Sequence, residues 1–242
     1  MDQPRIASQT EWLAARKKLL AREKQLTHLH DQVNAERRAL PWVKVEKPYV
    51  FEGPNGQETL ADLFEGRSQL IVYHFMWRFD IDSGCPSCSF LSDHIDGANR
   101  HLPHHDVTLL AVSRGPFAEL AAYRQRMGWR FKLVSSHGSD FNYDYGVSFT
   151  KADLAKGKVC YNYGMTEGYD ELPGLSVFAK DAAGEVFHTY STYARGGDIF
   201  IGAHNFLDLT PRGRNETTIM DWVRRHDEYD AAKPLPSCCH PA

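Results

Sequence analysis

The sequence predicts an α/β protein in which a mixed sheet carries helices on both faces. The first observation behind this prediction is the run at residues 69–77, whose apolar, β-branched and aromatic side chains are typical of a strand buried on both faces. The second is that strand-like and helix-like stretches alternate after this run, as they do in layered α/β domains. A long, charged segment with helical periodicity precedes the alternation.

The composition of the 242-residue chain is that of a globular protein with a substantial core, because 42% of its residues are hydrophobic and 24% are charged. Net charge is −3 and the basic residues are dispersed, so we expect no nucleic-acid partner. The longest apolar run is far shorter than the ~20 residues of a membrane helix, and the first residues lack the pattern of a signal peptide. We therefore expect a cytoplasmic protein without a membrane partner.

The N-terminal segment, residues 1–40, is predicted to hold one amphipathic helix from about Thr10 to about Leu40. Ser8 and Glu11 have the spacing of a capping box, and Pro41 follows the expected end. Apolar side chains recur every seven residues, at Trp12, Leu19, Leu26, Val33 and Leu40. This stripe could form a coiled coil, pack on its own domain or contact a second subunit. We expect a homodimer in which the helix contributes to the interface.

The elements of the α/β domain, residues 41–229, follow in order. A strand at residues 43–51 and a turn at 53–56 lead to a helical turn at 60–64 and the buried strand at 69–77. The later predicted elements are a helix after residue 85, a strand at 107–112, a helix at 117–127, a strand at 131–134, a hairpin of strands at 175–179 and 185–190, and a helix at 215–229. Residues 140–170 lack a clear period and are interpreted as an insertion. Residues 230–242 are expected to form a flexible, Cys-containing tail.

The five cysteines are the most informative residues. Cys85 and Cys88 form a Cys-x-x-Cys motif after the buried strand, Cys238 and Cys239 are adjacent near the end, and Cys160 stands alone. Five cysteines are too few, and odd in number, for a disulfide-stapled scaffold. In a reducing compartment, paired cysteines are more often catalytic, redox-sensing or metal-binding than structural.

The Cys85–Cys88 spacing fits a redox dithiol at the start of a helix. Unpaired backbone N–H groups and the helix dipole there would favour the thiolate of Cys85, and Pro86 suits the first helical position. Cys88, one turn on, would attack a mixed disulfide and release the partner. We expect the two Cα atoms to lie within the ~7 Å that a disulfide permits.

Further motifs narrow the fold. The order of elements is that of the thioredoxin fold, and the segment 173–178 (PGLSVF) resembles the thioredoxin stretch in which a cis-proline faces the dithiol. The segments EWLAARKKLLAREK, LIVYHFMW, LPGLSVF, HTYSTYARGGD and LDLTPRGR closely resemble the domain-of-unknown-function family 899 (DUF899), a bacterial group of thioredoxin-like proteins, over residues 11–229. The resemblance implies a thioredoxin-like fold, a thiol–disulfide role and a cis peptide bond at Pro173.

The chain departs from the peroxiredoxins of the same superfamily at two positions. Peroxiredoxins carry a Thr three residues before the peroxidatic Cys, where this chain has Asp82, and an Arg at the start of the late strand, where it has Pro173. These departures argue against a peroxidase. The leading prediction is a cytosolic thiol–disulfide oxidoreductase that needs no cofactor, uses Cys85, Cys88 and Pro173, and acts on a protein or small-molecule thiol or disulfide.

Two alternatives stay open. In the first, the chain handles copper or zinc, with Cys85, Cys88 and His188 as ligands and His74 as another candidate, because two thiolates and an imidazole suit these metals. In the second, it is a catalytically silent binding module that uses the N-terminal helix and the tyrosines of residues 140–170.

Several other residues have ordinary interpretations. We expect Arg195 to pair with Asp198 and the cluster at His101, His104 and His105 to lie in a solvated turn. Asp80 and Asp82 beside the dithiol are expected to point away from it or to accept protons. Cys160 is interpreted as an ordinary, partly buried cysteine, whereas Cys238 and Cys239 could exchange electrons with the dithiol or capture a soft metal.

Overall fold

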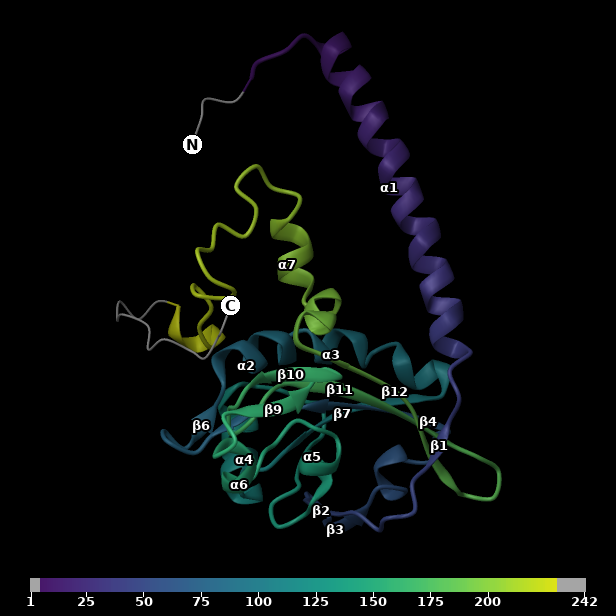
Figure 1. Cartoon of the computed structure of the whole chain (residues 1–242), viewed down its shortest axis with the longest axis vertical. Helices are drawn as coiled ribbons and strands as arrows, with labels where there is room; N and C mark the ends of the chain where they lie inside the picture. The colour runs from purple at the N-terminus through teal and green to yellow at the C-terminus, as the bar shows by residue number, and fades with distance from the viewer. Residues whose placement is uncertain (1–4, 230–242) are drawn as a thin grey trace. The chain divides into compact units, whose positions relative to one another are not determined.

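An eight-stranded mixed sheet forms the centre of the chain after residue 41 in the computed structural model, which describes residues 5–229 (Figure 1). In sheet order the strands are β1 (Val43–Lys44), β12 (Val186–Tyr193), β11 (Gly174–Lys180), β4 (Gln69–His74), β7 (Val107–Ser113), β8 (Leu133–Ser135), β2 (Val50–Gly53) and β3 (Gly56–Thr59). The pairs β4–β7 and β7–β8 are parallel, and the other neighbours are antiparallel. The predicted mixed sheet is confirmed.

Short helices and two small hairpins join these strands. The α-helices are α2 (Pro86–Ser92), α3 (Ile95–Ala98), α4 (Phe117–Arg126), α5 (Phe141–Asp144), α6 (Lys151–Leu154) and α7 (Gly202–Leu207). The 3-10 helices are η1 (Asp62–Phe64), η2 (Leu102–His105), η3 (Ala194–Phe200) and η4 (His226–Glu228), and the two hairpins are β5 (Trp77–Arg78) with β6 (Ser83–Gly84) and β9 (Lys158–Tyr161) with β10 (Gly164–Glu167). The β9–β10 hairpin is the regular part of the predicted insertion.

Strand β4 contributes to two hydrophobic cores because successive strand residues point to opposite faces of a sheet. Tyr73 packs in one core with residues of α2 and α4. Leu70 and Val72 pack in the other with residues of η1 and α5. Helical segments therefore cover both faces, and the thioredoxin-like fold class predicted from the sequence is confirmed.

Helix α1 (Gln9–Arg38) forms a unit of its own, since the chain divides between residues 41 and 42. The predicted capping box is present: the Ser8 hydroxyl accepts the Glu11 N–H at 3.3 Å, and the Glu11 carboxylate accepts the Ser8 N–H at 2.9 Å. No residue of the helix is buried, and the seven-residue stripe is exposed along its length. None of the described helices is both long and apolar enough to cross a membrane.

The prediction of a helix at residues 215–229 is wrong. Those residues form turns and the short η4 instead. Asn215 and Met220 have φ values of 50° and 60°, which a right-handed helix excludes. The N–H groups of Thr217 and Thr218 donate to the Asp221 carboxylate, so local side-chain bonds replace the helical ladder.

Candidate active site

Helix α2 begins at the cysteine motif. Cys85 is its N-cap, with extended backbone at φ −62° and ψ 132°, and Pro86 occupies the first helical position. The Cys85 carbonyl accepts the Ser89 N–H at 2.9 Å, so Cys85 and Cys88 share the first turn, as their spacing predicts. Side chains three apart on a helix have Cβ atoms about 5–6 Å apart.

The backbone that precedes the dithiol is tightly packed. A Cβ atom on Gly84 would lie 2.5 Å from the Tyr123 ring and 2.6 Å from the Phe75 ring, so no other residue fits here without displacing them. The buried Arg225 guanidinium donates to the Gly84 carbonyl at 2.7 Å. Packing and hydrogen bonding therefore fix the chain directly before Cys85.

A chain of buried hydrogen bonds continues from Arg225 to the cysteine. Arg225 Nε donates to the Tyr123 hydroxyl at 3.1 Å, and this hydroxyl bonds the Ser89 hydroxyl at 2.7 Å. The Ser89 hydroxyl donates to the Cys85 carbonyl at 2.8 Å. Because every partner is buried, these bonds hold the N-terminus of α2 in one geometry.

Cys88 has a hydroxyl partner of its own. The Tyr73 side chain, buried in strand β4, hydrogen-bonds to Cys88. Burial and the nearby cysteines raise the pKa of Tyr73 well above its usual value, so its hydroxyl stays protonated and can donate to sulfur. The arrangement suits a cysteine that must become a thiolate inside the protein.

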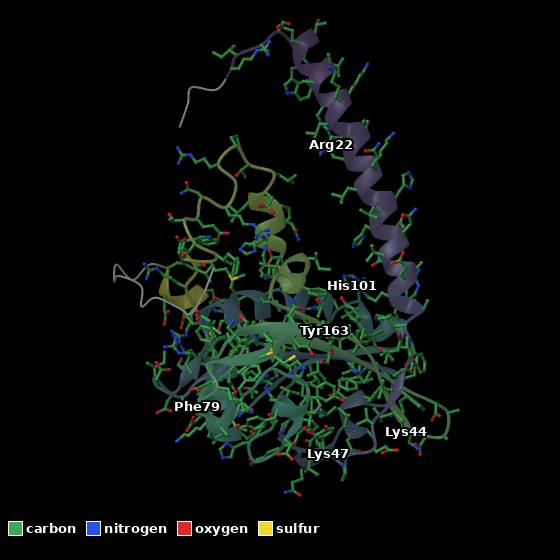
Figure 2. All side chains as sticks on the ribbon, viewed as in Figure 1. Arg22, Lys44, Lys47, Phe79, His101 and Tyr163 are labelled. Atoms are coloured by element: carbon green, nitrogen blue, oxygen red, sulfur yellow. The ribbon has the colours of Figure 1, made fainter. Side chains whose placement is uncertain are left out.

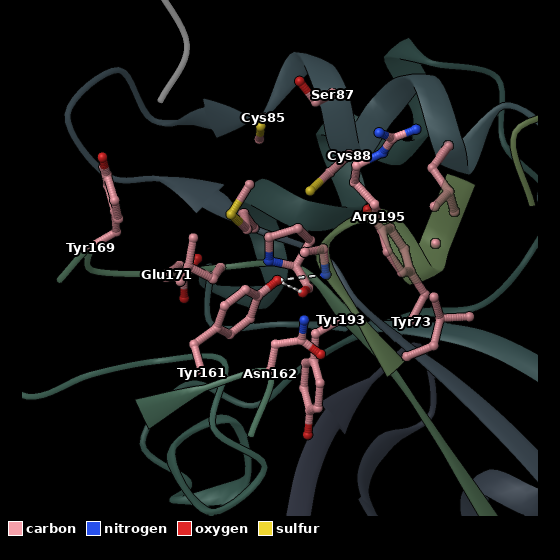
Figure 3. A pocket seen from close by; sticks show the side chains of 18 of the residues that line it. Tyr73, Cys85, Ser87, Cys88, Tyr161, Asn162, Tyr169, Glu171, Tyr193 and Arg195 are labelled. Carbon is pink, nitrogen blue, oxygen red and sulfur yellow. Dashed lines mark hydrogen bonds between the residues drawn. The ribbon is translucent and has the colours of Figure 1, made fainter. Parts of the chain in front are cut away.

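Both cysteines line a cavity of about 620 Å³ (Figure 3). Its walls come from the β5–β6 region, α2, the β9–β10 hairpin, the segment before β11, and η3. The cysteine side chains are nonetheless almost inaccessible, with 3% of Cys85 and 1% of Cys88 exposed. The dithiol thus faces a partly open cavity, although the two cysteines themselves are largely covered.

Pro173 lies on this cavity, but the prediction of a cis peptide bond is wrong. The described residues contain no cis peptide bond, so Leu172–Pro173 is trans. The insertion holds this segment on both sides: the Leu172 N–H donates to the Val147 carbonyl at 2.9 Å, and the Pro173 carbonyl accepts the Tyr161 hydroxyl at 2.5 Å. These contacts with residues 140–170 accompany the trans peptide bond. The prediction of a cis bond was based on the Pro173 motif alone and did not take these contacts into account.

Glu171 is a cavity residue that the sequence analysis missed. Its side chain is 6% exposed, accepts the Trp77 N–H at 2.8 Å and lies 3.5 Å from the Arg114 guanidinium. Burial raises the pKa of this carboxyl to about 7, although the Trp77 N–H and Arg114 oppose the shift. The only sequence signal for a role of Glu171 is its position two residues before Pro173. Its pairing with Ser148, which lies in the insertion, is visible only in the structure.

The candidate histidines belong to a separate polar network. His74 Nε2 bonds the Ser176 hydroxyl at 2.8 Å, His188 Nε2 bonds the Ser191 hydroxyl at 2.8 Å, and the two serines bond each other at 2.9 Å. Burial, with a smaller effect of His188, lowers the pKa of His74 to about 3, so His74 is neutral at physiological pH.

The structure does not assemble the predicted metal ligands. Neither His74 nor His188 lines the cavity that contains Cys85 and Cys88. Within residues 5–229, no three His, Cys, Asp or Glu side chains are grouped so that they could hold a metal ion. Each histidine instead bonds a serine hydroxyl. Composition and sequence spacing could not predict these partners.

The remaining candidates lie mostly as expected. Arg195 pairs with Asp198 at 3.3 Å, and Asp80 pairs with Arg78 at 2.6 Å, which removes one predicted proton acceptor from the thiols. Cys160 is exposed on β9 rather than partly buried, because it lies on the outward face of a two-stranded hairpin. His101, His104 and His105 lie exposed at η2, and Cys238 and Cys239 lie outside the described residues.

The sheet order, the helix that starts at the dithiol and the hairpin that follows define a thioredoxin-like protein. The model of the family described as "Bacterial protein of unknown function (DUF899)" matches residues 1–229, and the chain belongs to this family. The comparison with curated proteins finds no match.

Solved structures with a similar chain trace include peroxiredoxins. Peroxidoxin BcpB from Mycobacterium tuberculosis is 11% identical, with a TM-score of 0.43 over 67% of this chain and 93% of its own. A structure of peroxiredoxin Q from Xanthomonas campestris is 14% identical, with a TM-score of 0.44 over 69% of this chain and 96% of its own. Similarity at this level gives no information about the reaction of this chain.

Proposed function

We propose that the protein is a thiol–disulfide oxidoreductase in which Cys85 is the nucleophile and Cys88 the resolving cysteine. The observation that supports this function best is the position of both thiols in one helical turn beside a cavity. That cavity also contains the buried carboxyl of Glu171 and the Tyr73 side chain. The cytoplasmic location expected from the sequence would supply the reducing conditions that the dithiol needs.

The reaction consists of two thiol–disulfide exchanges. The Cys85 thiolate attacks one sulfur of a disulfide, forms a mixed disulfide and releases the first thiolate. Cys88 then attacks the Cys85 sulfur, which closes the Cys85–Cys88 disulfide and releases the second thiol. Two electrons pass from the protein to the substrate, and the two protons of the dithiol end on the released thiols.

Glu171 and Tyr73 have separate roles in this proposal. A carboxyl with a pKa of about 7 exchanges protons near neutral pH, so Glu171 can accept a thiol proton and return it to a leaving thiolate. The Tyr73 hydroxyl would stabilise the developing thiolate of Cys88 through its hydrogen bond. Tyr73 is a positioning residue, because it acts through Cys88.

Single-turnover reduction of a model disulfide tests the assignment. In a chain with Cys160, Cys238 and Cys239 replaced by Ser, Cys85→Ser should abolish reduction. In the same background, Cys88→Ser should release one thiol equivalent and accumulate a mixed disulfide at Cys85, visible by mass spectrometry. Full reduction by Cys85→Ser would contradict the proposal. An inactive wild-type protein that binds stoichiometric copper or zinc would favour the metal-handling alternative.

A further inference from the structure

We propose that the substrate of this dithiol is a low-mass organic disulfide with a mostly apolar body and a carboxylate group. This inference rests on the proposed function and adds the class of substrate. It depends on three features of the cavity: the burial of its cysteines, the attachment of its wall, and one arginine with uncommitted hydrogen-bond donors.

The β9–β10 hairpin restricts what can reach the sulfurs. The Tyr161 hydroxyl donates to the Pro173 carbonyl at 2.5 Å and accepts the Ala194 N–H at 2.9 Å (Figure 3). Tyr163, at the turn of the same hairpin (Figure 2), donates to the Ser191 carbonyl at 3.1 Å. The Tyr193 ring packs edge-on against both tyrosines. The insertion is thereby attached to the segment before β11, to β12 and to η3, which lie near the dithiol.

The size and lining of the cavity fit a small molecule. Its volume of about 620 Å³ falls in the ~300–1,000 Å³ range of small-molecule sites. Apolar side chains, among them Met76, Trp77, Leu91 and Met165, form much of its wall. Both thiols are almost fully buried beside the attached hairpin, which disfavours a folded protein as the disulfide substrate.

Arg195 provides the polar group that selects an anion. Its side chain is 70% exposed, and within residues 5–229 its guanidinium pairs with Asp198, through Nε at 3.3 Å. Asp198 also accepts a bond from Arg214 at 3.0 Å, so two arginines share this carboxylate. The two terminal nitrogens of Arg195 therefore remain available, and this planar pair matches a carboxylate. Arg195 lines the same cavity as the cysteines (Figure 3).

The reaction balances with the dithiol and substrate alone. One R–S–S–R bond breaks and one Cys85–Cys88 bond forms, while two R–SH molecules leave with the protons and electrons of the dithiol. The oxidant is the substrate disulfide itself.

The test compares three disulfides on the reduced full chain: anionic dithiobis(nitrobenzoate), neutral dithiodipyridine and the protein insulin. Cys160, Cys238 and Cys239 are replaced by Ser so that only the dithiol reacts. Arg195→Gln should slow the anionic probe about fivefold and change the neutral probe by less than about twofold. Arg212→Gln, an equal charge change at an exposed residue outside the cavity, should alter neither. The wild-type dithiol should leave insulin unreduced.

The outcomes separate the two proposals. Absence of reaction with all three disulfides would contradict the oxidoreductase function itself. Reduction of dithiodipyridine with equal effects of Arg195→Gln on both small probes, or reduction of insulin at the rate of the small probes, would overturn only the substrate class. The unchanged neutral-probe rate also shows that the Arg195 variant is folded.

Discussion

The environments of the two cysteines differ at the level of single residues. Around Cys85, hydrogen bonds hold the backbone. The Ser89 hydroxyl donates to the Cys85 carbonyl, and the Arg225 guanidinium donates to the Gly84 carbonyl. Around Cys88, the partner is a side chain, the Tyr73 hydroxyl. This difference matches the proposed roles, because an attacking sulfur needs a fixed position whereas a resolving one needs a stabilised charge.

Tyr73→Phe should slow the second exchange without slowing the first. The substitution keeps the ring in the core but removes the donor to Cys88, and hydrogen bonds to charged groups contribute about 1.5–3 kcal/mol. We expect the mixed disulfide at Cys85 to decay at least tenfold more slowly, measured by quenched mass spectrometry. Tyr49→Phe is the control, since it removes a tyrosine hydroxyl that bonds Asp144 outside the cavity. Equal decay in the Tyr73 variant and the wild type would exclude the positioning role.

Glu171 should make stability depend on pH. Its folded pKa of about 7 exceeds the ordinary value of 4.5, so the native state binds more protons than the unfolded state between these values. The free energy of unfolding should therefore fall as pH rises from about 4.5 to about 7, by at most about 3 kcal/mol from this group. Denaturant unfolding of the wild type and Glu171→Gln across this range measures the effect. An identical pH slope in both proteins would show that Glu171 does not titrate there.

At the level of secondary-structure elements, Arg225 attaches the irregular C-terminal segment to the start of α2. Arg225→Gln removes a buried guanidinium that bonds Gly84, Tyr123 and Glu228, and leaves these acceptors short of a donor. We expect a loss of about 3 kcal/mol in the free energy of unfolding by denaturant. Arg126→Gln is the matched control, because its partners Asp227 and Glu228 form more exposed ion pairs, of which each contributes about 1 kcal/mol or less. Similar losses in both variants would refute the anchoring role of Arg225.

The β9–β10 hairpin should limit access to the dithiol. Tyr161→Phe removes two hydrogen bonds that attach the hairpin near β11 and η3, each contributing about 1 kcal/mol. We expect iodoacetamide to alkylate Cys85 and Cys88 at least fivefold faster in this variant. Cys160 is an internal control, since it is already exposed and its rate should not change. Unchanged alkylation of the dithiol would mean that the hairpin does not control access.

The sequence predicted those elements whose patterns are local. The capping box of α1, the buried strand β4 and the start of α2 at Cys85 each depend on neighbouring residues, and each lies where it was expected. The strand run at residues 69–77 ends earlier, at His74, because Trp77 and Arg78 pair with Ser83 and Gly84 instead.

The missed features depend on contacts between distant residues. The Tyr73–Cys88 bond needs the register between β4 and α2, and the burial of Glu171 needs the insertion to fold over the cavity. The trans bond at Pro173 accompanies contacts with Val147 and Tyr161, which lie in that insertion. Local periodicity carries no information about such pairings.

At the scale of the whole molecule, the apolar stripe of α1 is the reason to expect a homodimer. Most of the stability of a helix in a protein comes from packing of its apolar face, so we expect the stripe to have a partner surface. We expect the full chain to sediment as a dimer at micromolar concentration and Leu26→Asp to weaken association. Lys24→Asp, on the opposite side of the same helix, is the control for an added carboxylate. A monomeric wild-type chain would refute this prediction.

The central claim is that Cys85 and Cys88 form one redox-active pair, and disulfide mapping tests it most directly. The reduced chain with Cys160, Cys238 and Cys239 replaced by Ser is mixed with one equivalent of a small disulfide. The products are then digested and identified by mass spectrometry. We expect two released thiols per chain and a peptide cross-linked between Cys85 and Cys88. Two unreacted cysteine thiols, or stable adducts without a Cys85–Cys88 bond, would contradict it.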